Sequence, residues 1–68
     1  MIVFDPFWNT LKKKNISTYT LINKYKISSS TISRLRNNKP ISTTTLDDSC
    51  RYLDCQVSDI LKYIPSQK

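Results

Sequence analysis

The sequence contains no glycine and no histidine, and each absence excludes a class of function. Without glycine, the chain cannot form the glycine-rich loop that cradles phosphates in nucleotide-binding enzymes. Without histidine, it lacks the commonest general base. Asp47 and Asp48 do not form a catalytic pair, because adjacent positions on a helix point in different directions. We therefore expect a protein that is not an enzyme and has no cofactor.

Cysteine and long apolar runs are also scarce. Cys50 and Cys55 lie five residues apart, which matches neither a CxxC motif nor a zinc-finger spacing, and we interpret both as reduced structural thiols. The apolar run Met1–Phe4 is too short for the hydrophobic part of a signal peptide, and no other run could span a membrane. The sequence predicts a cytoplasmic protein with no membrane partner and no evident small-molecule ligand.

Acidic residues are absent from Pro6 to Leu46, where most of the lysines and arginines lie. The net charge is +6. Of the five acidic residues, four follow in the last third of the chain, at Asp47, Asp48, Asp54 and Asp59. This asymmetry indicates a phosphate-binding face backed by a neutral or interacting face. The simpler alternative is that the lysines only keep a small protein in solution.

Sixty-eight residues, of which 38% are hydrophobic, are enough for one small domain that spans residues 1–68. Close packing of several short helices is the architecture that we predict for it. The first helix starts with Asp5 as its N-cap and Pro6 at its first position. It ends at Lys12–Lys14, which we interpret as a solvated helix end rather than a specific contact. Before it, Ile2–Phe4 is a short β-prone segment that must pair or pack elsewhere.

Serines provide the caps of the next three predicted helices. Ser17 caps a helix that runs to about Tyr25, Ser28 caps one that ends at Asn37–Pro40, and Ser42 caps the fourth. Apolar residues at helical spacing mark the buried stripes of the fourth and fifth helices: Leu46, Cys50 and Leu53, then Ile60, Leu61 and Ile64. Pro65 stops the fifth helix, and Ser66–Lys68 should be a loose tail. The prediction is an all-α, five-helix domain.

The second and third predicted helices have the arrangement of a helix-turn-helix over about residues 18–37, with the turn at Lys26 and Ile27. Their shared core should consist of Leu21, Ile22, Ile27, Ile32 and Leu35. On the third helix, small hydroxyl side chains would allow close approach to a DNA major groove, while arginine reaches base edges or phosphates. The alternative is an ordinary amphipathic helix with a solvated polar face.

Residues 17–35 have the order S-x-x-x-L-x-x-x-x-x-I-S-x-x-T-I-S-R-L, and a lysine-bearing loop and T-L-x-x-x-C-x-x-L follow. This arrangement resembles the Cro/cI-type, lambda-repressor-like regulators. The run Leu53–Ile64 is similar to the C-terminus of their short, stand-alone bacterial members. The resemblance covers roughly residues 5–64. It implies a five-helix fold whose third helix reads the major groove, and two copies on a palindromic operator in double-stranded DNA.

By position, this resemblance assigns the reading of bases to Ser29, Ser30, Ser33 and Arg34. It assigns phosphate contacts to Thr18, Asn37 and Lys39, and the capping argument adds Ser28, at the third helix's N-terminus. For Arg34, bidentate recognition of guanine and a phosphate contact both stay open. Ser29 and Ser30 either touch bases or only continue the cap.

Two positions depart from the family pattern. Ile22 stands where the family usually has a small residue, and its bulk would widen the angle between the two helices. Lys26 stands where glycine is frequent, and it would cost about 1 kcal/mol in a left-handed backbone.

The sequence thus predicts a sequence-specific DNA-binding transcriptional regulator, a repressor that binds its operator as a homodimer. Apolar residues at both ends of the chain are free to form the dimer interface, by pairing of the N-terminal segments or packing of the fifth helices. The alternative is a protein-interaction module of the same fold, an antitoxin or adaptor with secondary DNA binding. RNA binding ranks third, since the basic face lacks an aromatic stacking surface and we interpret Trp8 and Tyr52 as core or interface anchors.

Overall fold

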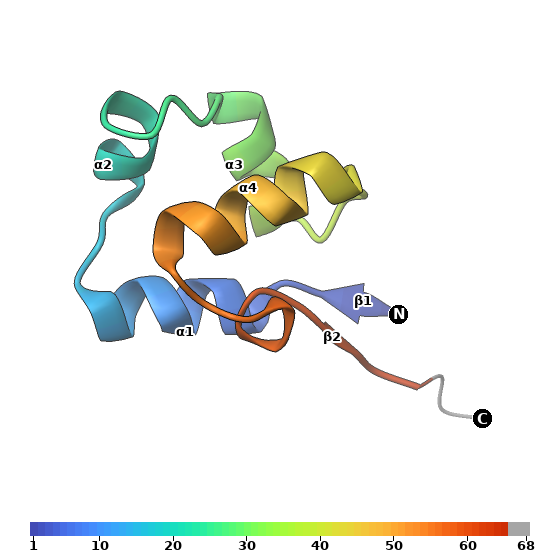
Figure 1. The fold of residues 1–68 in the computed structure, drawn as a ribbon. Coiled ribbons are helices and arrows are strands. Elements are labelled where there is room, and N and C mark those ends of the chain that lie inside the picture. Colours follow the sequence, from blue (N-terminus) through green and yellow to red (C-terminus); the bar gives the residue numbers. More distant parts are fainter. Residues whose placement is uncertain (66–68) are drawn as a thin grey trace.

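The computed structural model describes residues 1–65, so the predicted tail Ser66–Lys68 lies outside the described residues. The chain forms β1 (Ile2–Val3), α1 (Asp5–Lys14), α2 (Thr18–Asn23), α3 (Ser29–Arg36), α4 (Thr43–Leu53), the 3-10 turn η1 (Val57–Asp59) and β2 (Lys62–Tyr63). In Figure 1, α2 and α3 form the helix-turn-helix, α4 crosses in front of the C-terminal part of α3 with α1 below it, and β1 and β2 lie side by side at one end. The fold is mostly helical, with a short two-stranded sheet.

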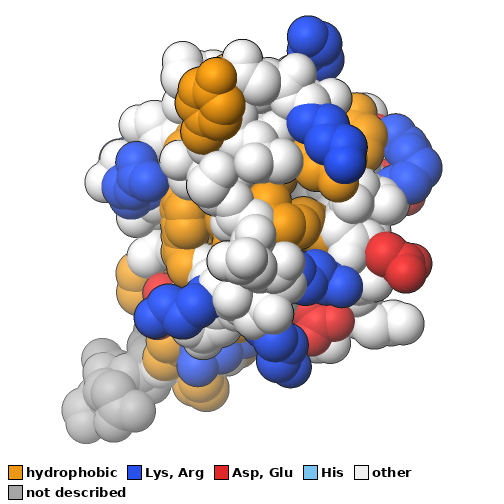
Figure 2. Space-filling view, turned by 90° about the vertical axis from the view of Figure 1, so that its left-hand side faces the viewer, with side chains coloured by type: hydrophobic (Ala, Val, Ile, Leu, Met, Phe, Trp, Pro, Cys, Tyr) orange, Lys and Arg blue, Asp and Glu red, His pale blue; other side chains and the backbone are white. Residues whose placement is uncertain are grey.

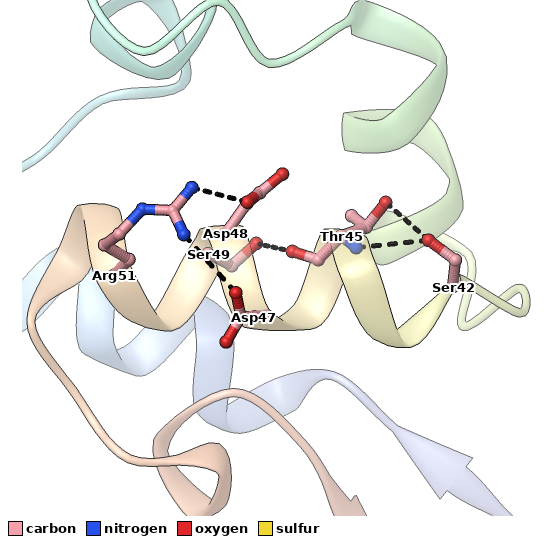
Figure 3. Close-up of polar contacts among 6 residues, drawn as sticks. All are labelled: Ser42, Thr45, Asp47, Asp48, Ser49 and Arg51. Carbon is pink, nitrogen blue, oxygen red and sulfur yellow. Dashed lines mark hydrogen bonds and ion pairs between the residues drawn. The ribbon is translucent and has the colours of Figure 1, made fainter.

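The predicted serine caps of α2, α3 and α4 are confirmed. In each case the serine Oγ accepts the backbone N–H of the residue three positions later, which satisfies a donor that the helix itself cannot. The N–H···Oγ distances are 3.1 Å from Thr20 to Ser17, 3.2 Å from Thr31 to Ser28 and 3.1 Å from Thr45 to Ser42. Figure 3 shows the cap of α4.

Within the described part of the chain, four residues take the left-handed backbone conformation that glycine usually supplies: Asn15, Lys26, Asn38 and Asp54. Lys26 has φ 61° in the turn between α2 and α3, so the strain considered for this residue is present, at about 1 kcal/mol. Asn38, at φ 54°, follows the C-terminus of α3, and the Lys39 N–H then donates to the Arg34 carbonyl at 2.8 Å. Asparagine therefore ends α3 as predicted, through Asn38 rather than Asn37.

The core takes buried side chains from every helix and from the segment after α4: Phe4, Phe7, Leu11, Leu21, Ile32, Leu35, Leu53 and Ile60. Three of the residues predicted for the helix-turn-helix core, Leu21, Ile32 and Leu35, are buried, and Ile27 packs against them. The prediction for Ile22 is wrong, because this side chain is 38% exposed. Leu21 already points into the core, and the next residue of a helix lies about 100° further around its axis.

Two helix boundaries differ from the predicted ones. The N-cap of α1 is Phe4 rather than Asp5, so Asp5 and Pro6 lie inside the first turn, where proline's missing N–H costs nothing. Helix α2 ends at Asn23, short of Tyr25, because the Ile27 N–H reaches back to the Leu21 carbonyl at 3.1 Å and closes the helix.

The predicted fifth helix is wrong: residues 1–65 form four α-helices, and the segment after α4 forms η1 and β2. A helix here would need the Asp59 and Ile60 carbonyls to accept N–H groups four residues later. Instead, the Thr10 hydroxyl donates to the Asp59 carbonyl at 2.7 Å, and the Phe7 N–H donates to the Ile60 carbonyl at 3.1 Å. Both acceptors are therefore used by α1.

The backbone after Ile60 is used by the N-terminal segment. The Ile64 N–H donates to the Met1 carbonyl at 2.7 Å, and the sheet register pairs Ile2 with Tyr63 and Val3 with Lys62. The short β-prone segment at the N-terminus thus finds its partner here. Pro65 limits the length of any helix that could form in this segment, and short helices are marginally stable. The segment pairs with β1 instead.

The surface of α4 carries two aspartates next to an arginine. Arg51 lies 3.3 Å from Asp47 and 2.6 Å from Asp48, and the hydrogen bond to Asp48 raises the pKa of Arg51 (Figure 3). Cys50 and Cys55, near the end of this helix, are half-buried and free, and burial raises the pKa of the Cys55 thiol.

Candidate nucleic-acid interface

The four residues assigned to base reading lie on the exposed side of α3. Ser29, Ser30, Ser33 and Arg34 are all exposed, while Ile32 and Leu35 of the same helix are buried in the core. Core packing on one side of α3 thus leaves a face with three hydroxyl groups and one guanidinium group free to meet a ligand. Its small side chains allow a close approach of the helix backbone.

The Ser28 hydroxyl is central to a small hydrogen-bond network at the N-terminus of α3. Besides accepting the Thr31 N–H, its Oγ lies 2.9 Å from Thr31 Oγ1 and 3.1 Å from Ser30 Oγ. Ser30 is therefore part of the cap as well as of the exposed face. These bonds fix the first turn, where the N–H groups and the helix dipole favour a negatively charged group.

The residues assigned to phosphate contacts lie at the ends of α2 and α3. Thr18 is half-buried in the first turn of α2, whereas Ser28, Asn37 and Lys39 are exposed around α3. The Asn37 side chain folds back on the helix, with Nδ2 donating to the Ser33 carbonyl at 2.9 Å. Its position is thus fixed by the helix that carries Ser33 and Arg34.

The two arginines of α3 have different surroundings. The Arg36 guanidinium lies over the Trp8 ring, 5.0 Å from its centroid, and Trp8 Nε1 donates to the Leu35 carbonyl at 3.4 Å. In residues 1–65, the ion pairs are those of Arg51, so Arg34 has no carboxylate neutralising it. Arg36 thus binds α3 to α1, and Arg34 remains outward and charged.

Sequence reasoning missed this contact between α1 and α3. Trp8 was expected to anchor a core or an interface, but its partners Leu35 and Arg36 are far away in the chain, and no spacing pattern connects them. A second such contact joins the residues after α3 to the segment between β1 and α1, where the Phe4 N–H donates to Asn38 Oδ1 at 2.9 Å. Both contacts fix the position of α3 from outside the helix-turn-helix.

Tyr25 and Tyr52 form a third contact that holds the helix-turn-helix in place. Their rings stack with centroids 5.0 Å apart and planes inclined by 17°. Tyr25 follows α2 and Tyr52 belongs to α4, so the stack ties the turn of the motif to the helix beneath it. The prediction that Tyr52 is an anchor rather than a base-stacking platform agrees with this arrangement.

Basic side chains are spread over the side of the molecule that carries α2. In Figure 2, lysines and arginines are scattered over this face among uncharged side chains, most of the visible aspartates lie toward one edge, and apolar side chains show between the cations. Residues 1–65 contain no cluster of metal-ligating side chains and no helix long and apolar enough to cross a membrane.

Helices α2 and α3, with the left-handed turn between them and the exposed face of α3, define a helix-turn-helix DNA-binding fold. The chain belongs to the family described as the Cro/C1-type HTH DNA-binding domain, whose model matches residues 7–66. The structure is similar to the crystal structure of the transcriptional regulator VanUg, Form II, with a TM-score of 0.85 and 28% identity over 96% of this chain and 87% of that chain. No curated protein sequence matches the chain. The resemblance noted in the sequence is thereby confirmed.

Proposed function

We propose that this protein is a cytoplasmic, sequence-specific transcriptional regulator, a repressor that occupies an operator as a homodimer and blocks polymerase. Residues 1–68 act as one helix-turn-helix domain. The observation that carries the proposal is the exposed face of α3, where three serines and an unpaired arginine stand on a helix that the core and Trp8 hold in place. Membership in the Cro/C1-type family supports the DNA-binding role.

In this mechanism the N-terminal turn of α3 enters the major groove. Ser29, Ser30 and Ser33 allow the backbone to approach the base edges and offer hydroxyl groups that can donate or accept. Arg34 donates two hydrogen bonds to O6 and N7 of a guanine, a geometry that its planar guanidinium matches.

Phosphates on either side of the groove are bound by residues at the helix ends. Thr18 and Ser28 lie at the N-termini of α2 and α3, where backbone N–H groups favour an anion. Asn37 and Lys39 follow α3 and contact the backbone further along. These contacts position the protein without distinguishing between sequences.

Arg34→Ala tests the base-reading role. We expect a loss of about 1–3 kcal/mol on the preferred site and little change on unrelated DNA, the typical effect of one bidentate base contact. Arg34→Lys should restore general affinity without the discrimination. Arg51→Ala is the matched control, because it removes the same charge from α4, and it should affect both DNAs little. Fluorescence anisotropy on the two DNAs measures this.

An equal loss on specific and unrelated DNA would make Arg34 a phosphate contact instead. Specificity would then have to come from the serines or from DNA shape. Circular dichroism should show an unchanged fold, since Arg34 is exposed and outside the core.

Salt dependence tests the phosphate contacts. A dimer that neutralises about 6–8 phosphates should show a slope of about −5 to −7 when the logarithm of the binding constant is plotted against the logarithm of salt concentration. Lys39→Ala should weaken binding to all DNA sequences and make this slope shallower. Lys62→Ala, which removes the same charge from β2, should leave the slope nearly unchanged. A flat salt dependence in the unmodified protein would contradict the proposed phosphate contacts.

A protein-interaction module, such as an antitoxin or adaptor, is the second candidate. It is supported by exposed apolar side chains that DNA would not cover, among them Tyr63 at 65%. Selection from a random DNA pool separates the two functions. An enriched two-fold symmetric motif supports the regulator, and the absence of any enriched motif supports the interaction module.

A further inference from the structure

An apolar groove of about 500 Å³ runs along the outer side of β1. The loop between α3 and α4 and the first turns of α4 form its other wall. Its apolar lining comes from Ile2, Phe4, Pro40, Ile41, Leu46 and Leu61, and Lys39 contributes the one charged side chain. A groove of this composition stands out on a chain with a net charge of +6.

The rim of the groove exposes two further apolar side chains. Met1 is 64% exposed and Ile2 43%, and both also line the groove. Ile2 belongs to a strand of only two residues, in a sheet of two strands. Such a small sheet is marginal by itself, and a third strand would both stabilise it and cover these side chains.

The backbone of β1 has a free edge on the groove side. Met1 and Ile64 exchange two backbone hydrogen bonds, so they form a hydrogen-bonded pair of the antiparallel ladder. Because such pairs alternate, the next pair, Ile2 with Tyr63, directs its N–H and C=O groups outward. The Phe4 N–H, two residues after Ile2, points the same way and is bound by Asn38 Oδ1. The Ile2 N–H and C=O are therefore available to another strand.

We propose that the occupant of this groove is the β1 segment of a second copy of the chain. The two β1 strands pair antiparallel with Ile2 opposite Ile2 of the other copy, which gives a continuous four-stranded sheet across the two-fold axis. Each copy inserts its Met1 side chain into the groove of the other. This inference rests on the dimer of the proposed function and assigns its interface to the N-terminal strand.

Two observations favour a second copy over a different protein. The outward N–H and C=O groups of Ile2 are self-complementary, because an antiparallel pair centred on one residue exchanges both bonds with its own image. In addition, two chains of net charge +6 repel each other, so they can meet only where cations are few. The groove meets this condition, because Lys39 is the one charged side chain in its lining and the Met1 ammonium group is bound by the Ile64 carbonyl of the same chain.

Ile2→Pro tests the strand pairing by removing the outward N–H. The β1–β2 ladder does not use this N–H, and proline is tolerated on edge strands, so the monomer fold should persist. We expect the dimer dissociation constant, measured by sedimentation equilibrium without DNA, to rise at least about tenfold. Tyr63→Pro is the matched control, because it removes an outward N–H from the other edge of the sheet, and it should leave the constant unchanged.

A second pair of variants tests the same interface through side chains. Ile2→Lys places two like charges at the two-fold axis and should also give monomers. Val57→Lys, which changes a side chain 49% exposed on η1, should remain dimeric. This pair keeps the test decisive if proline at position 2 unfolds the chain, which circular dichroism would reveal.

Three outcomes would overturn this interface. The first is a dimer that survives Ile2→Lys, and the second is a dimer that is lost on Tyr63→Pro but not on Ile2→Pro. The third is an unmodified chain that stays monomeric at all concentrations. A chain that stays monomeric would also contradict the homodimer of the proposed function, whereas the first two outcomes overturn only the interface assigned here. DNA binding itself is tested separately, by the Arg34 variants on specific and unrelated DNA.

Discussion

The helix-turn-helix and the segment after α4 are stabilised by hydrogen bonds of different range. In α2 and α3 the caps join residues three positions apart, as from Thr31 to Ser28. In the segment after α4, the bond from Thr10 to Asp59 spans 49 positions. The first region therefore carries much of its conformational information locally, whereas the second takes its shape from α1 and β1.

This difference has an energetic consequence. A helix cap contributes about 1 kcal/mol and its loss affects mainly the turn that it closes. The segment after α4, in contrast, inserts Ile60 into the core beside Phe7 and bonds to two elements at once. Damage there should spread through the whole domain, while damage in a cap should stay near the helix that loses it.

The largest effect should follow from Ile60→Ala. Ile60 is fully buried, and truncating such a side chain costs about 2–5 kcal/mol. Ile64→Ala is the control, because Ile64 is 40% exposed, and it should cost much less. Urea unfolding followed by circular dichroism measures both. Equal costs would indicate that Ile64 is buried as well, as in the five-helix arrangement.

Ser28→Ala should have a smaller, local effect. The loss of the α3 cap should lower the free energy of unfolding by about 1 kcal/mol. DNA affinity should fall too, because the first turn of α3 frays. Ser58→Ala changes an exposed serine within η1 and serves as the control for a lost hydroxyl. A fall in stability as large as that of Ile60→Ala would contradict the local character of the cap.

The smallest effect, and one of opposite sign, should come from Lys26→Gly. Lys26 has φ 61°, so glycine relieves strain and should stabilise the protein by up to about 1 kcal/mol. Lys24→Gly is the matched control two residues earlier, where the backbone is right-handed at φ −88° and glycine should destabilise. Thermal melts of the two variants should shift in opposite directions, and a shift in the same direction would argue against the left-handed turn.

The parts of the fold that could be predicted from the sequence are those stabilised by local hydrogen bonds, and the parts that could not are those stabilised by distant residues. Ser17, Ser28 and Ser42 act within one helical turn, and the three caps were recognisable without tertiary information. The fifth helix was not formed because Thr10, Phe7 and Met1 bind the backbone groups that it would have used, and no local pattern reports such partners. Here the tertiary context overrides apolar spacing.

In the candidate site, too, the local features could be predicted from the sequence and the long-range contacts could not. The outward placement of Ser29, Ser30, Ser33 and Arg34 follows from the helical period alone, once Ile32 and Leu35 are taken as buried. The contacts that hold α3 in place, from Trp8 and Asn38, join distant parts of the chain and were not foreseen. Their roles in DNA binding stay predictions.

The contact of Trp8 with the end of α3 has a spectroscopic consequence. The chain contains a single tryptophan, and its indole ring lies under Arg36 and donates to the Leu35 carbonyl. Its emission therefore depends on the position of one helix end, and any displacement of that end changes the cation and the carbonyl dipole next to the fluorophore. The intrinsic fluorescence of the unlabelled protein accordingly reports the movement of α3, in solution and in real time.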